Sequence, residues 1–205
     1  MCGRFSLYKI SEFLNEYNVR FDEPLKPRYN IAPGQMVPII ADGGKVAKWG
    51  FVPHWADEPK ISPINTRKES LAKRFFKDSY EKRRCLVPAD GFYEWKKVDG
   101  SKIPYRLVLD RDVFCFAGIY DIWKDTITFS IITVEPNDVI RPIHDRMPAI
   151  LAKKQEEAWL SDGSMDLLSA YPGKMNAFRI SDRVNSPLND DPSVIEDKKG
   201  LSDFF

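Results

Sequence analysis

Most apolar residues in this chain fall in short runs that have the spacing of β-strands. Residues 126–134 alternate between apolar and polar side chains over their first half, as expected for a strand with one buried face. Residues 113–123 are almost continuously apolar, as in a strand that is buried on both faces. The same criteria predict further strands at 37–40, 46–52, 83–88, 92–96, 105–109 and 175–180.

Turn signals join several of these strands into hairpins. Asp42-Gly43-Gly44 and Asp99-Gly100 each separate two apolar runs, and such Asp-Gly sequences are typical of tight β-hairpin turns. Many strands at short spacing predict an α+β fold built on a curved, mainly antiparallel β-sheet or open barrel with a few flanking helices. We expect one domain over residues 1–205, with a mobile, partly ordered polar tail from about residue 186 to 205.

Helical patterns are fewer and shorter. Apolar residues at helical spacing predict a helix over residues 6–18. Thr66 followed by Glu69 is a capping-box pattern, and it predicts a helix that begins there and runs to about Phe75. Two more short helices are expected at 153–160 and 164–170.

Composition narrows the classes of function. The 43% hydrophobic and 30% charged content is that of a soluble globular protein, and a net charge of +1 leaves nucleic-acid binding only to a local patch. Three cysteines and two histidines support neither a disulfide framework nor a zinc site, so we expect no metal, no cofactor and a reducing, cytoplasmic location. No apolar run has the length of a membrane span, and we expect a monomer without membrane association.

Cys2 directly follows the start methionine, and this position offers unusual chemistry. Removal of Met1 would leave an α-amine and a thiol on one residue. Such a 1,2-aminothiol condenses with an aldehyde, first as an imine and then as a thiazolidine ring. An internal cysteine cannot react in this way because its nitrogen is an amide. The alternative is that Cys2 is an incidental residue on a frayed terminus.

Three further stretches carry polar side chains in unexpected places. Asn65 stands at the start of a predicted helix, Glu94 lies between Tyr93 and Trp95 in a predicted strand, and His144-Asp145-Arg146 lies between two prolines. Turn chemistry, a solvent-facing strand position and a solvated loop would explain them equally well. Their residue types alone therefore leave the choice open.

Six longer sequence blocks favour a functional interpretation of these residues, because the blocks resemble a known family. They occur in a fixed order and are Met1–Phe5, Tyr29–Gln35, Trp49–Pro53, Asn65–Glu69, Arg84–Trp95 and Pro142–Pro148. Together they resemble the SRAP family, which comprises the SOS response-associated peptidases or abasic-site processing proteins. Arg183-Val184-Asn185 is a weaker late match. In the block Asn65–Glu69, Thr66 and Lys68 stand where the family often has alanine.

The resemblance implies a function and roles for four residues. Family members bind single-stranded DNA at abasic sites and capture the aldehyde of the ring-opened sugar as a thiazolidine. The resemblance implies that Cys2 supplies the amine and thiol and that Asn65 orients the amine. Glu94 would move protons during imine formation, and His144 would protonate the sugar oxygen as the ring opens. Burial beside aromatic residues would raise the pKa of Glu94 toward neutrality.

The same resemblance implies a DNA interface. Arg4, Arg67 and Arg146 would converge on one groove and bind phosphates. Trp55 and Trp95 would stack on bases, although packing in the core is the alternative for each. Cys85 and Cys115 lie in apolar runs and are expected to be buried rather than reactive.

Two other functions remain open at this stage. One is a cysteine peptidase that uses Cys2, Glu94 and His144, with its own Met1–Cys2 bond as the clearest substrate. The other is a module that binds single-stranded DNA without a covalent bond. The preferred interpretation is a cytoplasmic abasic-site sensor that associates with the nucleoid when bound to DNA.

Overall fold

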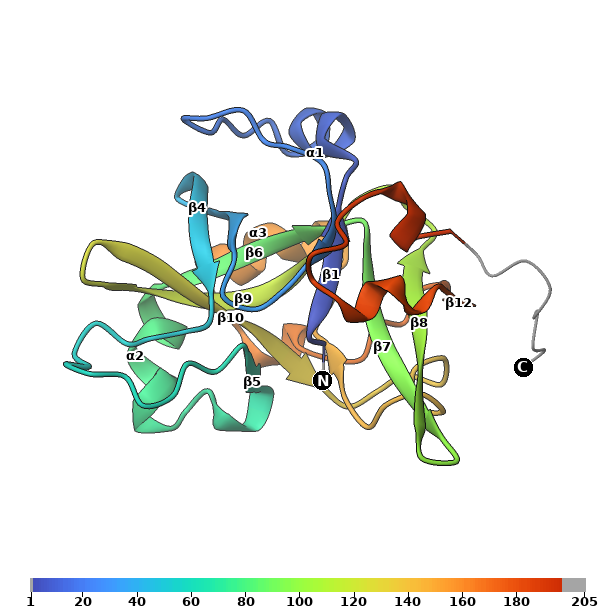
Figure 1. The fold of residues 1–205 in the computed structure, drawn as a ribbon. Coiled ribbons are helices and arrows are strands. Elements are labelled where there is room, and N and C mark those ends of the chain that lie inside the picture. Colours follow the sequence, from blue (N-terminus) through green and yellow to red (C-terminus); the bar gives the residue numbers. More distant parts are fainter. Residues whose placement is uncertain (1, 197–205) are drawn as a thin grey trace.

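The structure is a computed structural model that describes residues 2–196, and its centre is a closed barrel (Figure 1). A seven-stranded sheet has the order β11-β10-β4-β3-β6-β9, with β5 also paired to β10. Because β10 pairs with both β4 and β9, five of these strands close on themselves. The strands are β3 (Met36–Ala41), β4 (Gly43–Trp49), β5 (Asn65–Arg67), β6 (Arg84–Ala89), β9 (Phe114–Trp123), β10 (Thr126–Val134) and β11 (Met147–Pro148).

A second sheet of five strands lies against the barrel, in the order β12-β8-β7-β1-β2. Its strands are antiparallel and are β1 (Arg4–Leu7), β2 (Arg28–Ile31), β7 (Gly91–Val98), β8 (Ser101–Leu109) and β12 (Met175–Arg179). Phe5 of β1 packs edge-on against Trp49 of β4 and Phe116 of β9. The N-terminal strand is therefore fixed to the core of the barrel.

Helices are short and lie around the sheets. They are α1 (Ile10–Tyr17), α2 (Arg74–Lys82) and α3 (Lys153–Ser161), with 3₁₀ turns at Lys68–Ser70, Met165–Leu167, Asp182–Asn185 and Pro192–Val194. The α+β, mainly antiparallel fold predicted from the sequence is confirmed, and the barrel is closed rather than open. Among the described residues, no helix has the length and apolar character needed to cross a bilayer.

The helix predicted from Thr66 to about Phe75 is wrong over most of its length. Asn65–Arg67 forms β5, which pairs in parallel with β10, and the helix begins only at Arg74. Thr66 does not cap a helix, because its hydroxyl lies 2.8 Å from the Ser130 hydroxyl on β10. A long-range strand pairing has overridden a local capping pattern.

The first helix is also shorter than predicted. Residues up to Leu7 belong to β1, and α1 begins at Ile10 without a side-chain cap. The buried carboxylate of Asp90 accepts hydrogen bonds from the backbone N–H groups of Tyr8 and Lys9. This distant side chain fixes the turn between strand and helix. The predicted helix at 164–170 is reduced to the 3₁₀ turn Met165–Leu167.

The expected tail falls partly within the described residues. Asp190 accepts hydrogen bonds from the backbone N–H groups of Tyr29 and Asn30 at 2.6 and 2.8 Å, and Val194 is fully buried. Asp190 thus fixes this stretch to β2. The rest of the expected tail, residues 197–205, lies outside the described residues.

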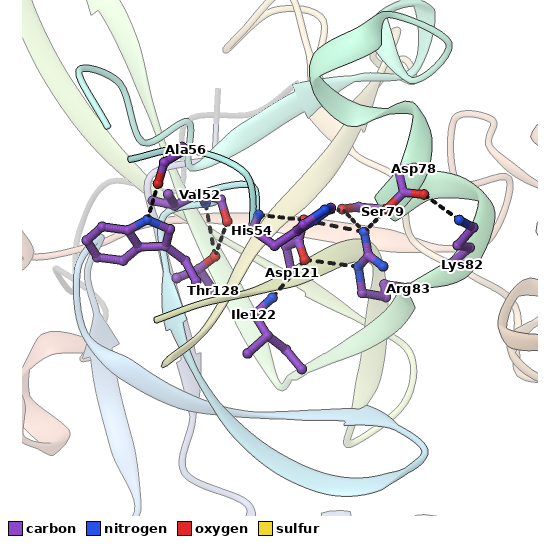
Figure 2. Close-up of polar contacts among 11 residues, drawn as sticks. Val52, His54, Ala56, Asp78, Ser79, Lys82, Arg83, Asp121, Ile122 and Thr128 are labelled. Atoms are coloured by element: carbon purple, nitrogen blue, oxygen red, sulfur yellow. Dashed lines mark hydrogen bonds and ion pairs between the residues drawn. The ribbon is translucent and has the colours of Figure 1, made fainter. Parts of the chain in front are cut away.

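A buried carboxylate holds the loop after β4 to the barrel (Figure 2). Asp121 on β9 accepts hydrogen bonds from the His54 backbone N–H at 3.0 Å and from the Ser79 hydroxyl at 3.1 Å. The guanidinium of Arg83 lies 3.1 Å from the same carboxylate, as an ion pair. We call this cluster of Asp121, His54, Ser79 and Arg83 the Asp121 junction, because it joins the loop, α2 and β9.

Candidate active site at the end of β1

Cys2 lies at the N-terminal end of β1 and is fully buried. Arg4 pairs with Tyr93 across the β1–β7 ladder, so the residues before Arg4 lie beside Glu94 and Trp95, where β7 continues past the end of β1. The Cys2 thiol donates to the Arg4 carbonyl at 3.5 Å. Burial raises the pKa of this thiol above its ordinary range, and the charge of Glu94 adds to the effect. The sulfur therefore stays protonated at neutral pH.

Asn65 contacts Cys2 directly. Its side-chain N–H donates to the Cys2 carbonyl oxygen at 2.7 Å. The sequence interpretation had this amide orienting the Cys2 nitrogen, and the observed contact is with the carbonyl. The Asn65 side-chain oxygen is buried and accepts no hydrogen bond from residues 2–196, so an acceptor remains for an N–H group. Pairing of β5 with β10 sets the position of this side chain.

Glu94 is buried at 2% exposure on β7. It lines a cavity of about 370 Å³ together with Trp95, Lys97, Lys102, His144 and Asn185. Burial raises the pKa of Glu94 to about 7, and the nearby charge of Asp145 adds to this effect. A carboxyl group with this pKa can both donate and accept a proton at neutral pH. We call this cavity the Glu94 pocket.

His144 enters the same pocket from the loop between β10 and β11. Its ring Nδ1 accepts a hydrogen bond from the Arg146 backbone N–H at 3.1 Å and lies 2.8 Å from a carboxylate oxygen of Asp145. Nδ1 can accept from the backbone N–H or donate to the carboxylate, and the tautomer decides which of these two contacts is the hydrogen bond. Burial lowers the pKa of His144, which favours the neutral imidazole at pH 7.

Arg4 is engaged inside the protein. Its guanidinium donates to the Asn30 side-chain oxygen at 2.8 Å and to the Val184 and Asn185 carbonyls at 2.6 and 3.2 Å. Asn185 in turn accepts a hydrogen bond from the Trp95 indole at 2.7 Å. Arg4 thus holds the 3₁₀ turn at Asp182–Asn185 against the aromatic wall of the pocket.

Arg67 and Arg146 lie together on the far edge of β10. Arg146 is buried and donates to Glu135 at 2.5 Å, to Glu69 at 3.1 Å and to the Thr133 carbonyl at 2.7 Å. Arg67 is opposite Thr133 in the β5–β10 ladder, is exposed and has no hydrogen bond or ion pair within residues 2–196. The three arginines therefore do not form one set of free cations, because Arg4 and Arg146 are hydrogen-bonded inside the protein while Arg67 is exposed.

The two candidate stacking residues lie in different places. Trp95 is half-buried and lines the Glu94 pocket. Trp55 is 53% exposed, packs edge-on against Phe75 of α2 and belongs to the loop held by the Asp121 junction. Only Trp95 lies beside Glu94 and His144.

Comparison with known proteins identifies the family. A family model described as SOS response associated peptidase (SRAP) matches residues 1–187. The chain belongs to the SRAP family. The resemblance inferred from the six sequence blocks is confirmed.

Relatives in bacteria match over most of the chain. The abasic site processing protein YoqW of Bacillus subtilis is 39% identical, over 96% of this chain and 99% of that protein. The abasic site processing protein YedK of Escherichia coli is 30% identical, over 78% of this chain and 79% of its own. A crystal structure of a protein from Bacteroides thetaiotaomicron is 29% identical, with a TM-score of 0.86 over 96% of this chain.

Three pocket residues of this SRAP protein were missed as site residues. Asn185 lay in a weak late match, and its hydrogen bond to Trp95 spans 90 positions in the chain. Lys97 and Lys102 are brought face to face by the Asp99-Gly100 turn. The turn signal was visible in the sequence, and counting the ladder outward from it would have paired the two lysines.

The other candidate chemistry is absent from the described part of this SRAP protein. Residues 2–196 contain no cluster of three or more histidine, cysteine or acidic side chains that could hold a metal ion. Cys85 and Cys115 are fully buried in β6 and β9, and burial raises the pKa of both thiols. They therefore behave as core residues.

Proposed function

We propose that this protein captures abasic sites in single-stranded DNA as a covalent adduct on Cys2, after removal of Met1. The observation that carries the proposal is the position of Cys2 at the end of β1, beside a pocket where Glu94 has a pKa of about 7. Relatives named abasic site processing proteins support the choice of substrate. The adduct would shield the lesion, in the cytoplasm and on the nucleoid, with the protein acting as a monomer.

The proposed reaction is a condensation that releases one water molecule. The Cys2 amine attacks the aldehyde carbon of the ring-opened sugar and gives a carbinolamine. Glu94 in its acid form protonates the hydroxyl, which leaves as water, and the nitrogen keeps its proton in an iminium ion. The Cys2 sulfur then bonds to the iminium carbon and its proton passes to the Glu94 carboxylate, which restores the acid form and leaves a neutral thiazolidine. A carboxyl pKa of about 7 suits a group that serves as acid and then as base.

Asn65 and His144 would assist the condensation, Asn65 by orienting the amine and His144 by opening the sugar ring. The Asn65 amide holds the Cys2 carbonyl, and its buried oxygen is available to accept a hydrogen bond from the amine. His144, which also lines the pocket, would protonate the sugar ring oxygen as the ring opens. Both roles require a substrate sugar in the Glu94 pocket.

DNA contacts would come from a local surface, given the net charge of +1. Trp95 in the pocket wall would stack on a base, and exposed Arg67 would bind a phosphate. Arg146 would meet a phosphate only by exchanging one of its partners, Glu69 or Glu135. Arg4 would act through Asn185 and Trp95 rather than through DNA.

General peptidase activity is a weaker candidate. A cysteine nucleophile normally works as a thiolate with a lowered pKa. Burial raises the pKa of Cys2 instead, and the described contacts of its sulfur include no histidine. Cleavage of its own Met1–Cys2 bond remains compatible with the proposal, because that step prepares the amine.

Incubation with abasic single-stranded DNA and denaturing electrophoresis test the proposal. The processed protein should give a shifted band that survives denaturation, and Cys2→Ala should bind the strand without forming this stable band. Cys85→Ala is the matched control, because it removes an equally buried thiol that does not line the pocket.

Three outcomes would contradict the proposal. A full crosslink in Cys2→Ala would remove Cys2 from the chemistry. Equal, fully reversible binding to intact and abasic strands by the processed protein would indicate a noncovalent binding module. Cleavage of an unrelated peptide without any crosslink would indicate a peptidase.

A further inference from the structure

Two lysines face each other across the hairpin of β7 and β8. Lys97 is directly opposite Lys102 in the antiparallel ladder, and both are exposed. Like charges directly opposite each other destabilise a strand pair. Neither lysine forms a hydrogen bond or ion pair within residues 2–196, so no carboxylate in that range offsets the repulsion. The arrangement is unfavourable for the protein alone and favourable once an anion lies between the two ammonium groups.

The same face of the hairpin carries an aromatic side chain. Side chains two apart in a strand point to the same side, so Trp95 shares a face with Lys97 and with its partner Lys102. All three line the Glu94 pocket, together with His144 from the opposite loop. A basic surface with an adjacent aromatic platform is the arrangement that single-stranded nucleic acids bind.

Nearby carboxylates leave this positive charge in place. Glu94 has a pKa of about 7 and carries only part of a negative charge at neutral pH. Asp145 is directed to His144 at 2.8 Å, and Asp99 is in the hairpin turn and contacts neither lysine. The mouth of the pocket is therefore positive while its floor is close to neutral.

We propose that Lys97 and Lys102 form a phosphate subsite that holds the DNA phosphate next to the abasic sugar. The inference rests on the proposed function, because a sugar within reach of Glu94 has a phosphodiester on each side. Lysine ammonium groups bind phosphate as point charges and tolerate either non-bridging oxygen. The hairpin then positions the strand: the lysines bind the backbone, Trp95 stacks on the adjacent base, and the aldehyde is presented to Cys2.

The salt dependence of binding measures this subsite. Noncovalent affinity for abasic single strands would be measured over a series of salt concentrations in a Cys2→Ala background. Loss of this one phosphate contact should make the slope of log affinity against log salt shallower by about 0.7, the contribution of each neutralised phosphate in a single strand. We expect this change in the variant K97Q/K102Q. The matched control is K45Q/K48Q, which makes the same change in charge on β4, on the far side of the barrel in Figure 1.

A neutral phosphate locates the contact on the DNA. One methylphosphonate would be placed on the 5′ or the 3′ side of the abasic site, and single-turnover crosslinking would be measured. At one of the two positions, the neutral group should lower the crosslinking rate of the protein that has both lysines. The same group should have little further effect on the crosslinking rate of K97Q/K102Q, which already lacks the contact.

The outcomes separate the subsite from the proposed function. Unchanged salt slopes, or equal sensitivity of both proteins to each methylphosphonate, would overturn the subsite while crosslinking by the unmodified protein remained. A protein with native lysines that forms no crosslink at all would overturn the proposed function, even if its salt slope depended on the lysine pair.

Discussion

Asp121 and Glu94 are both buried acids on strands, yet their surroundings differ. Asp121 accepts hydrogen bonds from backbone and hydroxyl donors and pairs with Arg83 (Figure 2). Glu94 lies at the wall of an open cavity, where burial raises its pKa to about 7. A carboxylate surrounded by donors fixes a loop, whereas one that titrates near neutrality can exchange protons with a substrate.

The Asp121 junction also shows why residue types alone do not identify a site. It contains a serine, a histidine and an aspartate, the residue types of a hydrolase triad. However, the Ser79 hydroxyl donates to Asp121 rather than to His54, so the histidine cannot act as its base. The chemistry that we propose is instead at the Glu94 pocket, which contains no such set.

The largest expected effect separates the two acids by rate. Glu94→Gln should slow crosslinking to abasic DNA by about 10²–10⁴-fold, because general acid–base catalysis contributes this much. Asp121→Asn should leave the rate per folded molecule close to that of the unmodified protein. Single-turnover kinetics on both variants check this, and equal slowing of both would mean that the two regions are not functionally distinct.

For the free energy of unfolding, the Asp121 substitution should have the more damaging effect of the two. Asp121→Asn removes the buried carboxylate of the junction while Asp78 still pairs with Arg83, and it should lower the free energy of unfolding by about 1–3 kcal/mol. Urea unfolding monitored by circular dichroism measures it. A loss no greater than that of an ordinary surface substitution would show that the junction does not hold the loop.

Glu94→Gln should instead stabilise the protein, and only at higher pH. The folded pKa of about 7 lies above the ordinary value of 4.5, so the folded state binds more protons between these limits and stability falls as pH rises through them. The variant lacks this loss and should gain up to about 3 kcal/mol at pH 8, with no pH-dependent gain below pH 4.5. Urea unfolding at pH 4 and pH 8 provides the comparison; a gain that does not depend on pH would contradict the raised pKa.

The two tryptophans give the smallest expected effect. Trp95→Ala should weaken noncovalent binding to single-stranded DNA by about 1–3 kcal/mol, the value of one stacked base. Trp55→Ala should reduce the binding free energy by less, because Trp55 lies in the loop that the Asp121 junction holds and packs on Phe75. Fluorescence anisotropy with a labelled strand measures both, and a larger loss for Trp55 would move the DNA path to that side.

Local signals predicted much of the fold and long-range pairings account for the errors. The Asp99-Gly100 hairpin could be predicted because both turn residues adopt the positive φ that such turns require. The helix at Thr66 could not be excluded, since its competitor was a parallel pairing with β10, more than sixty residues away. Asp90 stabilises the start of α1 from a similar distance.

The site residues divide in the same way, into those that a sequence signal identified and those whose partners lie far away in the chain. Glu94, His144 and Trp95 were identified through family resemblance, and the structure brings them to one cavity. The carboxylate partners of Arg146 are separated from it by 77 and 11 residues, and no local pattern marks them. Their presence explains why a conspicuous arginine is not a free phosphate ligand.

The most direct test of the account is the mass of the adduct on Cys2. Processed protein and protein with a verified Met1 would be incubated with abasic single-stranded DNA, without reductant, and analysed by intact and peptide mass spectrometry. The account predicts an adduct only on processed protein, at the mass of protein plus DNA minus one water and located on the Cys2 peptide. A stable adduct on the chain that retains Met1 would contradict it, because the nitrogen of Cys2 is then an amide and no thiazolidine can close.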